Sequence, residues 1–424
     1  MTDFASIREE FPILDQQIHG HPLVYLDSAA TSQKPQCVID AEAEFYRTIN
    51  AGVHRGAHEL AARSTMAFEE ARAKMARLVG ANAAEGEEEV VVTSGATAGL
   101  NLLATAFGNA SLGRGGAAAK RFALKPGDEI VVSKAEYHSV LLPFQELAAR
   151  TGASLKWFDL DDEGRIRSDS ADEVITERTK IVAVTHVGNT TGAITDIAPI
   201  IRRAHEVGAV FILDACQSVP HLKVDFHALD VDFAAWSAHK MYGPTGVGFL
   251  YGKRDMLEAL PPANFGGSMV ELAWMDQEAR YMEPPARFEA GTQPVAQVVA
   301  AGVAADWLMS IGMENLEAHE RTITDELLAL GDIEGVRILG PRSNERRIGT
   351  IAFEVEGVHP HDVGQFIDAQ GIAIRVGHHC AQPVHRHFGV YASNRASSGI
   401  YNAVEDAQAL IETVKQVRPF FGVK

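Results

Sequence analysis

Residues 210–251 read VFILDACQSVPHLKVDFHALDVDFAAWSAHKMYGPTGVGFLY, and this stretch decides the fold. It contains three short apolar runs, at 210–214, 232–236 and 247–251, separated by polar and glycine-rich connections. Similar runs occur upstream at 89–93, 129–133, 154–158 and 180–186, with helical patterns between them at 97–107, 139–151, 172–178 and 197–207. Continuous apolar strands that alternate with helices indicate a mostly parallel sheet covered on both faces, so we predict an α/β fold.

The pattern changes after about Gln293. A long apolar helix is expected at 295–311, strands at 347–355 and 372–376, and an amphipathic closing helix at 403–418. We therefore predict three parts: an N-terminal segment (1–24) that packs with the small domain, a large domain (25–294) and a smaller α+β domain (295–424).

Composition excludes several classes of partner. The chain has 424 residues and a formal net charge of -18, which disfavours nucleic acid and anionic membranes. No apolar stretch reaches the roughly 18 residues of a membrane span. The first fifteen residues lack the order of a signal peptide, so we expect a cytoplasmic protein. The glycine- and alanine-rich stretch 108–123 predicts a mobile surface loop.

Polar residues follow the predicted strands at the edge where parallel sheets bind ligands. Asp214 ends one strand, and Lys240 follows the next. A lysine can hold pyridoxal phosphate (PLP) as a Schiff base, while a carboxylate keeps the pyridine nitrogen protonated. A helix cap or a metal ligand is the alternative for Asp214, but the Ser-x-His-Lys that follows favours PLP. The sequence therefore predicts a PLP site.

Other residues at these strand ends suit the same cofactor. The segment 93–97 lies between a strand and a helix, so the N–H groups of Ala96 and Thr97 would attract the phosphate. A simple helix cap by Ser94 or Thr97 is the alternative. Ser237 and His239, which flank Lys240, would add donors.

Three further side chains are expected around the ring of the cofactor. His138 is placed to stack on the ring and to exchange protons with a substrate. Asn189 and Gln217 are placed to reach the ring hydroxyl. A surface histidine and a turn-forming asparagine are the alternatives for His138 and Asn189.

The chain resembles the SUF-type (group II) cysteine desulfurases, which are class V, fold-type I PLP enzymes related to selenocysteine lyases. The matching segments are 25–31 (YLDSAAT), 53–58 (VHRGAH), 287–292 (RFEAGT), 375–380 (RVGHHC) and the cofactor segments above. The resemblance implies a large domain with a seven-stranded sheet. It also implies a homodimer in which Thr292 reaches the phosphate of the neighbouring subunit's cofactor.

Cys380 is the residue that would choose the reaction. PLP permits several reactions, and further protein groups select one of them. Cys380 follows a predicted strand and lies near Arg375, His378 and His379, whose charges would favour a thiolate nucleophile. A small buried thiol is one alternative. A zinc site with His378, His379, His385 and His387 is another, but adjacent residues rarely converge on one metal, so we predict no metal.

The resemblance also implies the chemistry. L-Cysteine would give up its sulfur to Cys380 as a persulfide, leaving L-alanine, while Lys240 moves the α-proton and His138 manages the thiol proton. Arg395 would anchor the substrate carboxylate, and His58 and Arg375 would line the entrance. A SufU-like or SufE-like acceptor protein would take the sulfur for iron–sulfur cluster assembly, because the loop after Cys380 is short.

Some alternatives and departures from the family pattern remain. A selenocysteine lyase or cysteine sulfinate desulfinase, an aminotransferase of the same class and a non-catalytic assembly scaffold are the competing functions. Tyr137 stands where the family commonly has a histidine, and Ser398-Gly399 where it usually has an aromatic residue. Every proposed catalytic group is nevertheless present.

Overall fold

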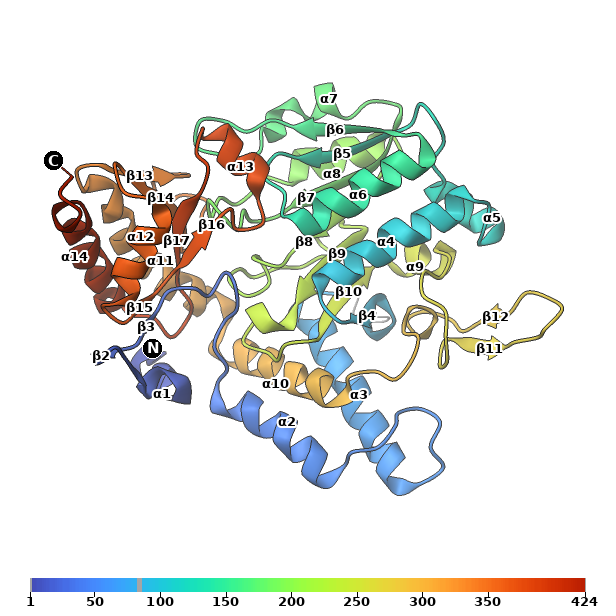
Figure 1. Cartoon of the computed structure of the whole chain (residues 1–424). Helices are drawn as coiled ribbons and strands as arrows, with labels where there is room; N and C mark the ends of the chain where they lie inside the picture. The colour runs from blue at the N-terminus through green and yellow to red at the C-terminus, as the bar shows by residue number, and fades with distance from the viewer. Residues whose placement is uncertain (1, 82–85, 424) are drawn as a thin grey trace.

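A computed structural model describes residues 2–81 and 86–423 of the chain (Figure 1). Its centre is a seven-stranded sheet in the order β4–β10–β9–β8–β7–β5–β6. The strands are β4 (Val90–Thr93), β10 (Gly248–Gly252), β9 (Phe233–Ser237), β8 (Val210–Asp214), β7 (Thr179–Thr185), β5 (Glu129–Ser133) and β6 (Ser154–Phe158). Neighbours from β9 to β6 are parallel, whereas β10 runs antiparallel to β9 and β4. The predicted mostly parallel sheet is therefore confirmed.

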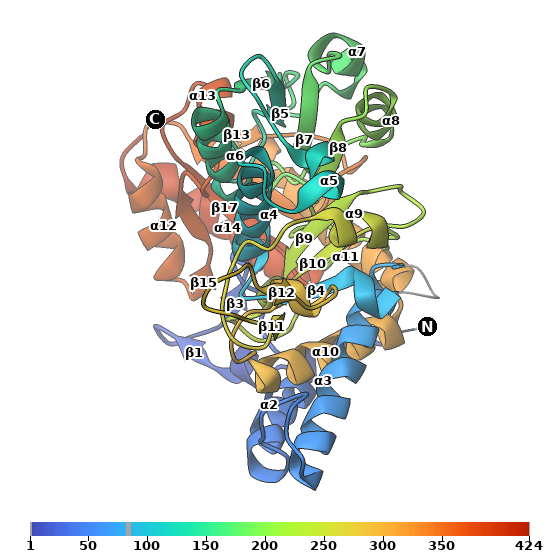
Figure 2. The ribbon, with the colours of Figure 1, turned by 90° about the vertical axis from the view of Figure 1, so that its right-hand side faces the viewer.

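Both faces of this sheet are covered at its centre, which explains why inner strands such as β8 and β9 are fully buried and almost continuously apolar. Alternate residues such as Ile212 and Leu213 belong to separate cores on opposite faces. On one face lie α4 (Ala96–Ser111) and α6 (His138–Thr151); α3 (Glu59–Leu78), α8 (Ala198–Glu206) and α10 (Val295–Ile311) contribute to the other core (Figure 2). Full burial of one large apolar side chain stabilises the fold by about 1.5–3 kcal/mol, so the helices on both faces contribute to the stability of the domain.

A smaller antiparallel sheet forms the second domain, in the order β13–β14–β17–β16. Its strands are β13 (Val336–Leu339), β14 (Thr350–Val355), β17 (Ser393–Ser397) and β16 (Arg375–Gly377). Three helices contribute to its core: α11 (Met313–Leu328), α12 (Pro360–Asp368) and α14 (Val404–Phe420). The predicted smaller α+β domain is present.

The N-terminal segment contacts both the large and the small domain. Strand β3 (Val24–Tyr25) pairs in parallel with β15 (Ile372–Ala373) of the small domain. Phe11 packs edge-on against Tyr401 and Trp307, with ring centroids 4.8 and 5.6 Å apart. Tyr401 and Trp307 lie in different parts of the chain, so Phe11 joins them through one aromatic cluster.

The remaining elements are short or peripheral. They are α1 (Phe4–Glu9), β1 (Gln17–Ile18), β2 (His21–Pro22), α2 (Gln36–Thr48), α5 (Gly116–Ala119), α7 (Ala171–Val174), α9 (Arg254–Ala259), β11 (Val270–Leu272), β12 (Arg280–Tyr281) and α13 (Gln382–His387). Within the described ranges no single helix is long and apolar enough to cross a membrane; the bent pair Val295–Ile311 and Met313–Asp332 passes by length and composition alone.

The predicted loop at 108–123 is wrong. Helix α4 continues to Ser111, α5 occupies Gly116–Ala119, and a 3-10 turn follows at Lys120–Phe122. Phe122 is buried and its ring lies 5.3 Å from that of Phe107. The glycine-rich composition concealed this one aromatic anchor, which fixes the segment on the core. Two smaller differences concern 372–376, which is split between β15 and β16, and 172–178, where the helix α7 is short.

A buried ion pair connects α3 to the segment that precedes α10. Arg72 donates to both carboxylate oxygens of Glu289, at 2.6 and 2.9 Å, and to the Val90 carbonyl at 2.7 Å. Glu289 also accepts from the Val92 N–H at 2.7 Å. The pair therefore fixes strand β4 against both flanking segments.

We expect Arg72→Met to lower the free energy of unfolding by about 3–5 kcal/mol, because Glu289 would be left charged, buried and unpaired. Chemical denaturation measures this loss. Lys223→Met is the matched control, because Lys223 pairs with Glu314 at 2.7 Å on an exposed surface and should contribute little. Equal small losses in the two variants would contradict the importance of the buried pair.

Candidate active site

A cavity of about 480 Å³ lies where the carboxyl ends of the large sheet meet the small domain. It is lined by most of the predicted site residues: Ala96, Thr97, His138, Asn189, Asp214, Gln217, Ser237, His239, Lys240, Arg375, Cys380 and Arg395. Tyr137 and Cys216 also line it. Residues predicted from five separate regions of the sequence, near 96, 138, 189, 214–240 and 375–395, thus surround one space.

Two predicted residues lie outside this cavity in the single chain. Thr292 lines another cavity, beside Tyr46 of α2. His58 precedes α3, where its Nδ1 accepts a hydrogen bond from the Ala61 N–H at 3.2 Å. In the part of one subunit that the structure describes, neither Thr292 nor His58 therefore lines the cavity.

Parallel strand geometry brings the two central residues together. Asp214 is the last residue of β8, and Lys240 closes a 3-10 turn that follows β9. These strands are parallel neighbours, with Asp214 opposite Ala235. The glycine-rich segment after the lysine closes the turn, because the Gly243 N–H donates to the Ala238 carbonyl at 2.9 Å. Asp214 and Lys240 thus face the same cavity.

The His239 carbonyl, directly before Lys240, is held by a cluster of donors. It accepts from Lys34 Nζ at 2.9 Å and from the Ser32 N–H at 3.0 Å. The hydroxyls of Thr31 and Ser32 each donate to it at 3.1 Å. These bonds fix the backbone from which the Lys240 side chain enters the cavity.

The lining residues fit PLP. Asp214 offers a buried carboxylate and Lys240 an amine. Gln217 donates from Nε2 to the Ala29 carbonyl at 2.8 Å, and its buried Oε1 has no hydrogen-bond partner among the residues described. An orphaned buried acceptor is costly unless a bound group supplies a donor, and a ring hydroxyl would do so.

The predicted phosphate end lies at the N-terminus of α4. The Ser237 hydroxyl accepts from the Ala96 N–H at 2.9 Å, and the Thr97 hydroxyl shares a hydrogen bond with Ser139 at 2.7 Å. These contacts tie β9, α4 and α6 together at one point. A helix N-terminus with two adjacent hydroxyls is suited to an anion.

His138 begins α6 and links this edge to the nucleophile candidate. Its backbone N–H donates to the Cys380 carbonyl at 2.9 Å. Burial, and then the nearby His378, lower the pKa of the His138 imidazole. A neutral imidazole near neutral pH can accept a proton, which suits the predicted role.

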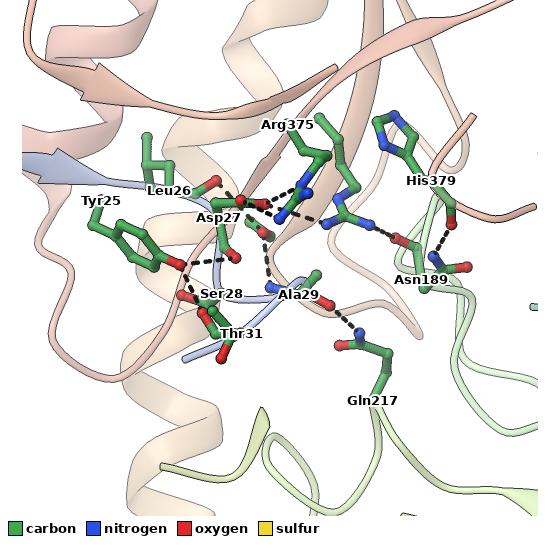
Figure 3. A network of polar contacts seen from close by, with 12 residues as sticks. Tyr25, Leu26, Asp27, Ser28, Ala29, Thr31, Asn189, Gln217, Arg375 and His379 are labelled. Atoms are coloured by element: carbon green, nitrogen blue, oxygen red, sulfur yellow. Dashed lines mark hydrogen bonds and ion pairs between the residues drawn. The ribbon is translucent and has the colours of Figure 1, made fainter. Parts of the chain in front are cut away.

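The loop that carries Cys380 has an unusual backbone. His379 and Cys380 have φ values of 51° and 54°, in the left-handed region. Such residues cost on the order of 1 kcal/mol or more each, so surrounding contacts must hold them. Asn189 Nδ2 donates to the His379 carbonyl at 2.7 Å (Figure 3). The Ala381 N–H donates to the His378 carbonyl at 2.9 Å.

A histidine pair supports this loop from behind. His379 Nε2 and His385 Nε2 both lie within hydrogen-bond distance of the Ser393 hydroxyl, at 2.9 and 3.0 Å. Burial, and then the charge of Arg395, lower the pKa of His379 to about 2. Both rings therefore support the loop as neutral groups. Within the described residues no cluster of His, Cys, Asp and Glu has a metal-binding arrangement.

Arg395 reaches from β17 into the same network. It is buried and donates from one guanidinium nitrogen to the Asn189 carbonyl at 3.0 Å. Another nitrogen lies 3.4 Å from Asp27, which also pairs with Arg375 at 2.9 Å (Figure 3). The buried Nε of Arg395 has no partner among residues 2–81 and 86–423. The contacts with Asn189 and Asp27 use two of the five N–H donors of the guanidinium, so donors remain for a bound anion.

The sequence alone assigns no role to three residues around this site. Asp27 belongs to a matching segment, and Tyr137 is a departure from the family pattern. Glu136 is fully buried and accepts from the Ser133 hydroxyl at 2.5 Å and the Thr185 N–H at 3.1 Å. The sequence offers one signal that could have identified this buried carboxyl group: Glu136 directly precedes two aromatic residues, Tyr137 and His138.

The chain matches the aminotransferase class-V family over residues 24–410. A probable cysteine desulfurase of Streptomyces coelicolor is 46% identical over 424 residues, covering 100% of this chain and 99% of that protein. Another, of Mycobacterium leprae, is 47% identical and covers 99% of this chain and 98% of that protein. The solved structure of cysteine desulfurase CsdA from Escherichia coli has a TM-score of 0.88 at 35% identity and covers 99% of each chain.

The chain therefore belongs to the aminotransferase class-V family, and within it to the cysteine desulfurases. This membership confirms the predicted fold-type I architecture, and PLP is the cofactor of the family.

Glu136 should make stability depend on pH. Burial raises the pKa of Glu136 to about 8 from its ordinary 4.5, so the folded protein keeps a proton that the unfolded chain releases. The stabilising contribution is complete below the unfolded value and is lost as pH rises toward about 8. From about pH 5 to about pH 8, wild-type stability should fall relative to Glu136→Gln by at most about 1.4 kcal/mol per pH unit. Parallel urea-unfolding profiles in the two proteins would contradict this assignment.

Proposed function

We propose that the protein is a cysteine desulfurase that takes sulfur from L-cysteine, releases L-alanine and retains the sulfur on Cys380. The observation that carries this proposal is the convergence of Lys240, Arg395 and Cys380 on one cavity from three different elements. When bound, PLP supplies an electron sink for carbanions at the substrate carbons. A thiol in the same cavity could then attack the sulfur of the substrate, so that sulfur transfer is the reaction selected.

The chain's own residues would hold the cofactor at several points. Lys240 would hold it covalently and Asp214 would keep its pyridine nitrogen protonated. Gln217 Oε1 would gain the donor that it lacks. Ser237, His239, Ala96 and Thr97 would surround the phosphate, and Asn189 would lie near the ring. In a homodimer, the partner's Thr292 would complete the phosphate site.

Substrate orientation would come from Arg395. Its unpartnered Nε and its fixed guanidinium plane suit a carboxylate, for which arginine offers directional donors. Arg375 lies at the same cavity and is paired with Asp27, so it would line the entrance. In a homodimer, the partner's His58 would line it too. A substrate held this way presents its side-chain sulfur toward Cys380.

The sulfur-transfer step is a displacement that balances. The Cys380 thiolate attacks the sulfur of the bound substrate, so that an S–S bond forms as the substrate's C–S bond breaks. The electron pair of that bond stays with the substrate carbon, which takes up a proton to become the methyl group of alanine. Lys240, once free as an amine, moves the α-proton, and His138 accepts the proton of the thiol.

We also propose a SUF-type setting for the enzyme: a cytoplasmic homodimer that supplies sulfur for iron–sulfur cluster assembly. The hydrogen bonds at His379 and Cys380 tether the loop at both carbonyls. A tethered persulfide cannot travel, so a SufU-like or SufE-like acceptor protein would have to approach it. In this proposal the large domain spans 25–294 and the small domain 295–424, with 1–24 packed on the latter. The first helix of the range 295–424, α10, contributes to the core of the large sheet.

We expect brief exposure of the holoenzyme to L-cysteine to add the mass of one sulfur atom to the Cys380 peptide, because that thiol is the proposed acceptor. Mass spectrometry of the digested protein measures this. The peptides of Cys37 and Cys216 serve as internal controls and should stay unmodified.

Cys380→Ser separates the competing functions. The proposal predicts that this variant releases no sulfide from cysteine but retains release of selenide from selenocysteine, which asks less of the thiol. Sustained cysteine turnover by Cys380→Ser would refute the persulfide route. Accumulation of pyruvate driven by an added keto acid would instead favour an aminotransferase.

A further inference from the structure

Two arginines of the cavity lie opposite each other on neighbouring strands. Strands β16 and β17 are antiparallel, and their register pairs Arg375 with Arg395. Both side chains line the cavity. Residues directly opposite on antiparallel strands have Cβ atoms about 4.5–5.5 Å apart, and like charges at such positions repel each other. The two guanidinium groups therefore require a counter-charge close by.

Asp27 supplies this counter-charge from the N-terminal part of the chain. Its two carboxylate oxygens accept from Arg375 Nη2 at 2.9 Å and from Arg375 Nε at 3.3 Å (Figure 3). The second of these oxygens also lies 3.4 Å from Arg395 Nη2. Among the described residues that line the cavity, both arginines are present and Asp27 is not. One carboxylate thus bridges both cations from behind the cavity wall.

The backbone on both sides of Asp27 fixes this carboxylate in place. The Leu26 N–H donates to the Ala373 carbonyl at 2.9 Å, and the Ser28 N–H donates to the Ser397 carbonyl at 3.1 Å. The side chain of Asp27 is only 14% exposed. The carboxylate therefore belongs to the small-domain framework that carries the two arginines.

The charges at the substrate end of the cavity can be counted. In the proposed function Asp214 and Lys240 serve the cofactor, so the two arginines are the cations that remain for the substrate. Guanidinium groups keep their charge at neutral pH. Two guanidinium charges and the carboxylate of Asp27 leave one net positive charge, which matches a single substrate carboxylate. A second anionic group on the substrate would find no unbalanced cation.

We propose that Asp27 is a specificity-determining positioning residue. Its carboxylate holds the two facing arginines and cancels one of their charges. The cavity therefore accepts an amino acid with one carboxylate, such as cysteine, and disfavours one with a second anionic group, such as cysteine sulfinate. This inference rests on the proposed function, because that function assigns the two arginines to the substrate.

The test compares two ligands that differ by one charge and need no turnover. L-Alanine and L-aspartate share the ammonium group and the α-carboxylate, and aspartate adds a second carboxylate. Their dissociation constants from the PLP-loaded holoenzyme are measured by titration calorimetry at about pH 7 and low ionic strength. We expect Asp27→Asn to lower the ratio of the aspartate constant to the alanine constant about tenfold, because a nearby negative charge is removed.

Two controls separate charge from shape and from general effects. Asp27→Glu keeps the carboxylate and should keep the wild-type ratio. Asp255→Asn removes the same charge from an exposed pair with Arg121, at 3.1 Å, on a helix that does not line the cavity. It should also keep the wild-type ratio, because solvent and salt screen an exposed charge.

A second variant tests the same charge balance from the opposite side. Arg375→Gln removes one cation while Asp27 remains, so the ratio should rise about tenfold. Asp27→Asn combined with Arg375→Gln restores the net charge and should return the ratio to the wild-type value, which a purely structural role would not do. An unchanged ratio in Asp27→Asn would overturn the proposal. If that variant does not fold, an unchanged ratio in Arg375→Gln would overturn it.

Failure of this inference is distinguishable from failure of the proposed function. If the ratio is unchanged while wild type still forms a persulfide on Cys380, Asp27 does not set specificity and the function stands. If the ratio shifts as expected but wild type forms no persulfide, the charge balance is real and the desulfurase proposal is wrong.

Discussion

Arg395 carries its guanidinium from β17 of the small domain to the edge of the large sheet, where it donates to the Asn189 carbonyl at 3.0 Å. Its other contact is Asp27, at 3.4 Å. Removing such a cation from water costs several kcal/mol unless its donors are satisfied, so the two domains can meet well in few arrangements. The partners of this one side chain therefore set where the small domain lies relative to the strand ends.

The position of the loop that carries Cys380 depends on the contact between Arg395 and Asn189. Asn189 accepts from Arg395 through its carbonyl and donates to the His379 carbonyl through its side chain, at 2.7 Å. His379 is also held by Ser393, which lies two residues before Arg395 on the same strand. A left-handed pair of residues is strained on its own, but here it is fixed from both domains. Cys380 consequently lines the same cavity as Lys240 on a loop that both domains hold.

The sequence predicted much of this architecture for physical reasons that can be named. Strands covered on both faces must be continuously apolar, so β5 and β8 could be predicted with their observed bounds. Parallel strands end at one edge, so the order of strands and polar residues is enough to place Asp214 and Lys240 together. Composition alone predicted a mobile loop at 108–123, which is wrong. The buried Phe122 anchors this glycine-rich segment to the core.

Long-range partners could not be predicted, because no periodicity encodes them. Nothing in the sequence shows that Asn189 turns its amide toward His379, 190 positions away. The same limit applies to Thr292 and His58, whose proposed roles require a second subunit. These contacts depend on how the two domains meet, and that is set by the tertiary structure.

Hydrogen exchange tests most directly whether the Arg395–Asn189–His379 connection holds the nucleophile in place. In Asn189→Ala, which removes the side-chain donor and keeps the carbonyl, the amides of His138 and Ala381 should exchange faster, because both donate within or to this loop. Amides of β8 should be unaffected. Asn394→Ala is the matched control, since Asn394 Nδ2 donates to the Pro360 carbonyl at 2.8 Å on the neighbouring position of β17. Unchanged protection of His138 and Ala381 in Asn189→Ala would contradict the account.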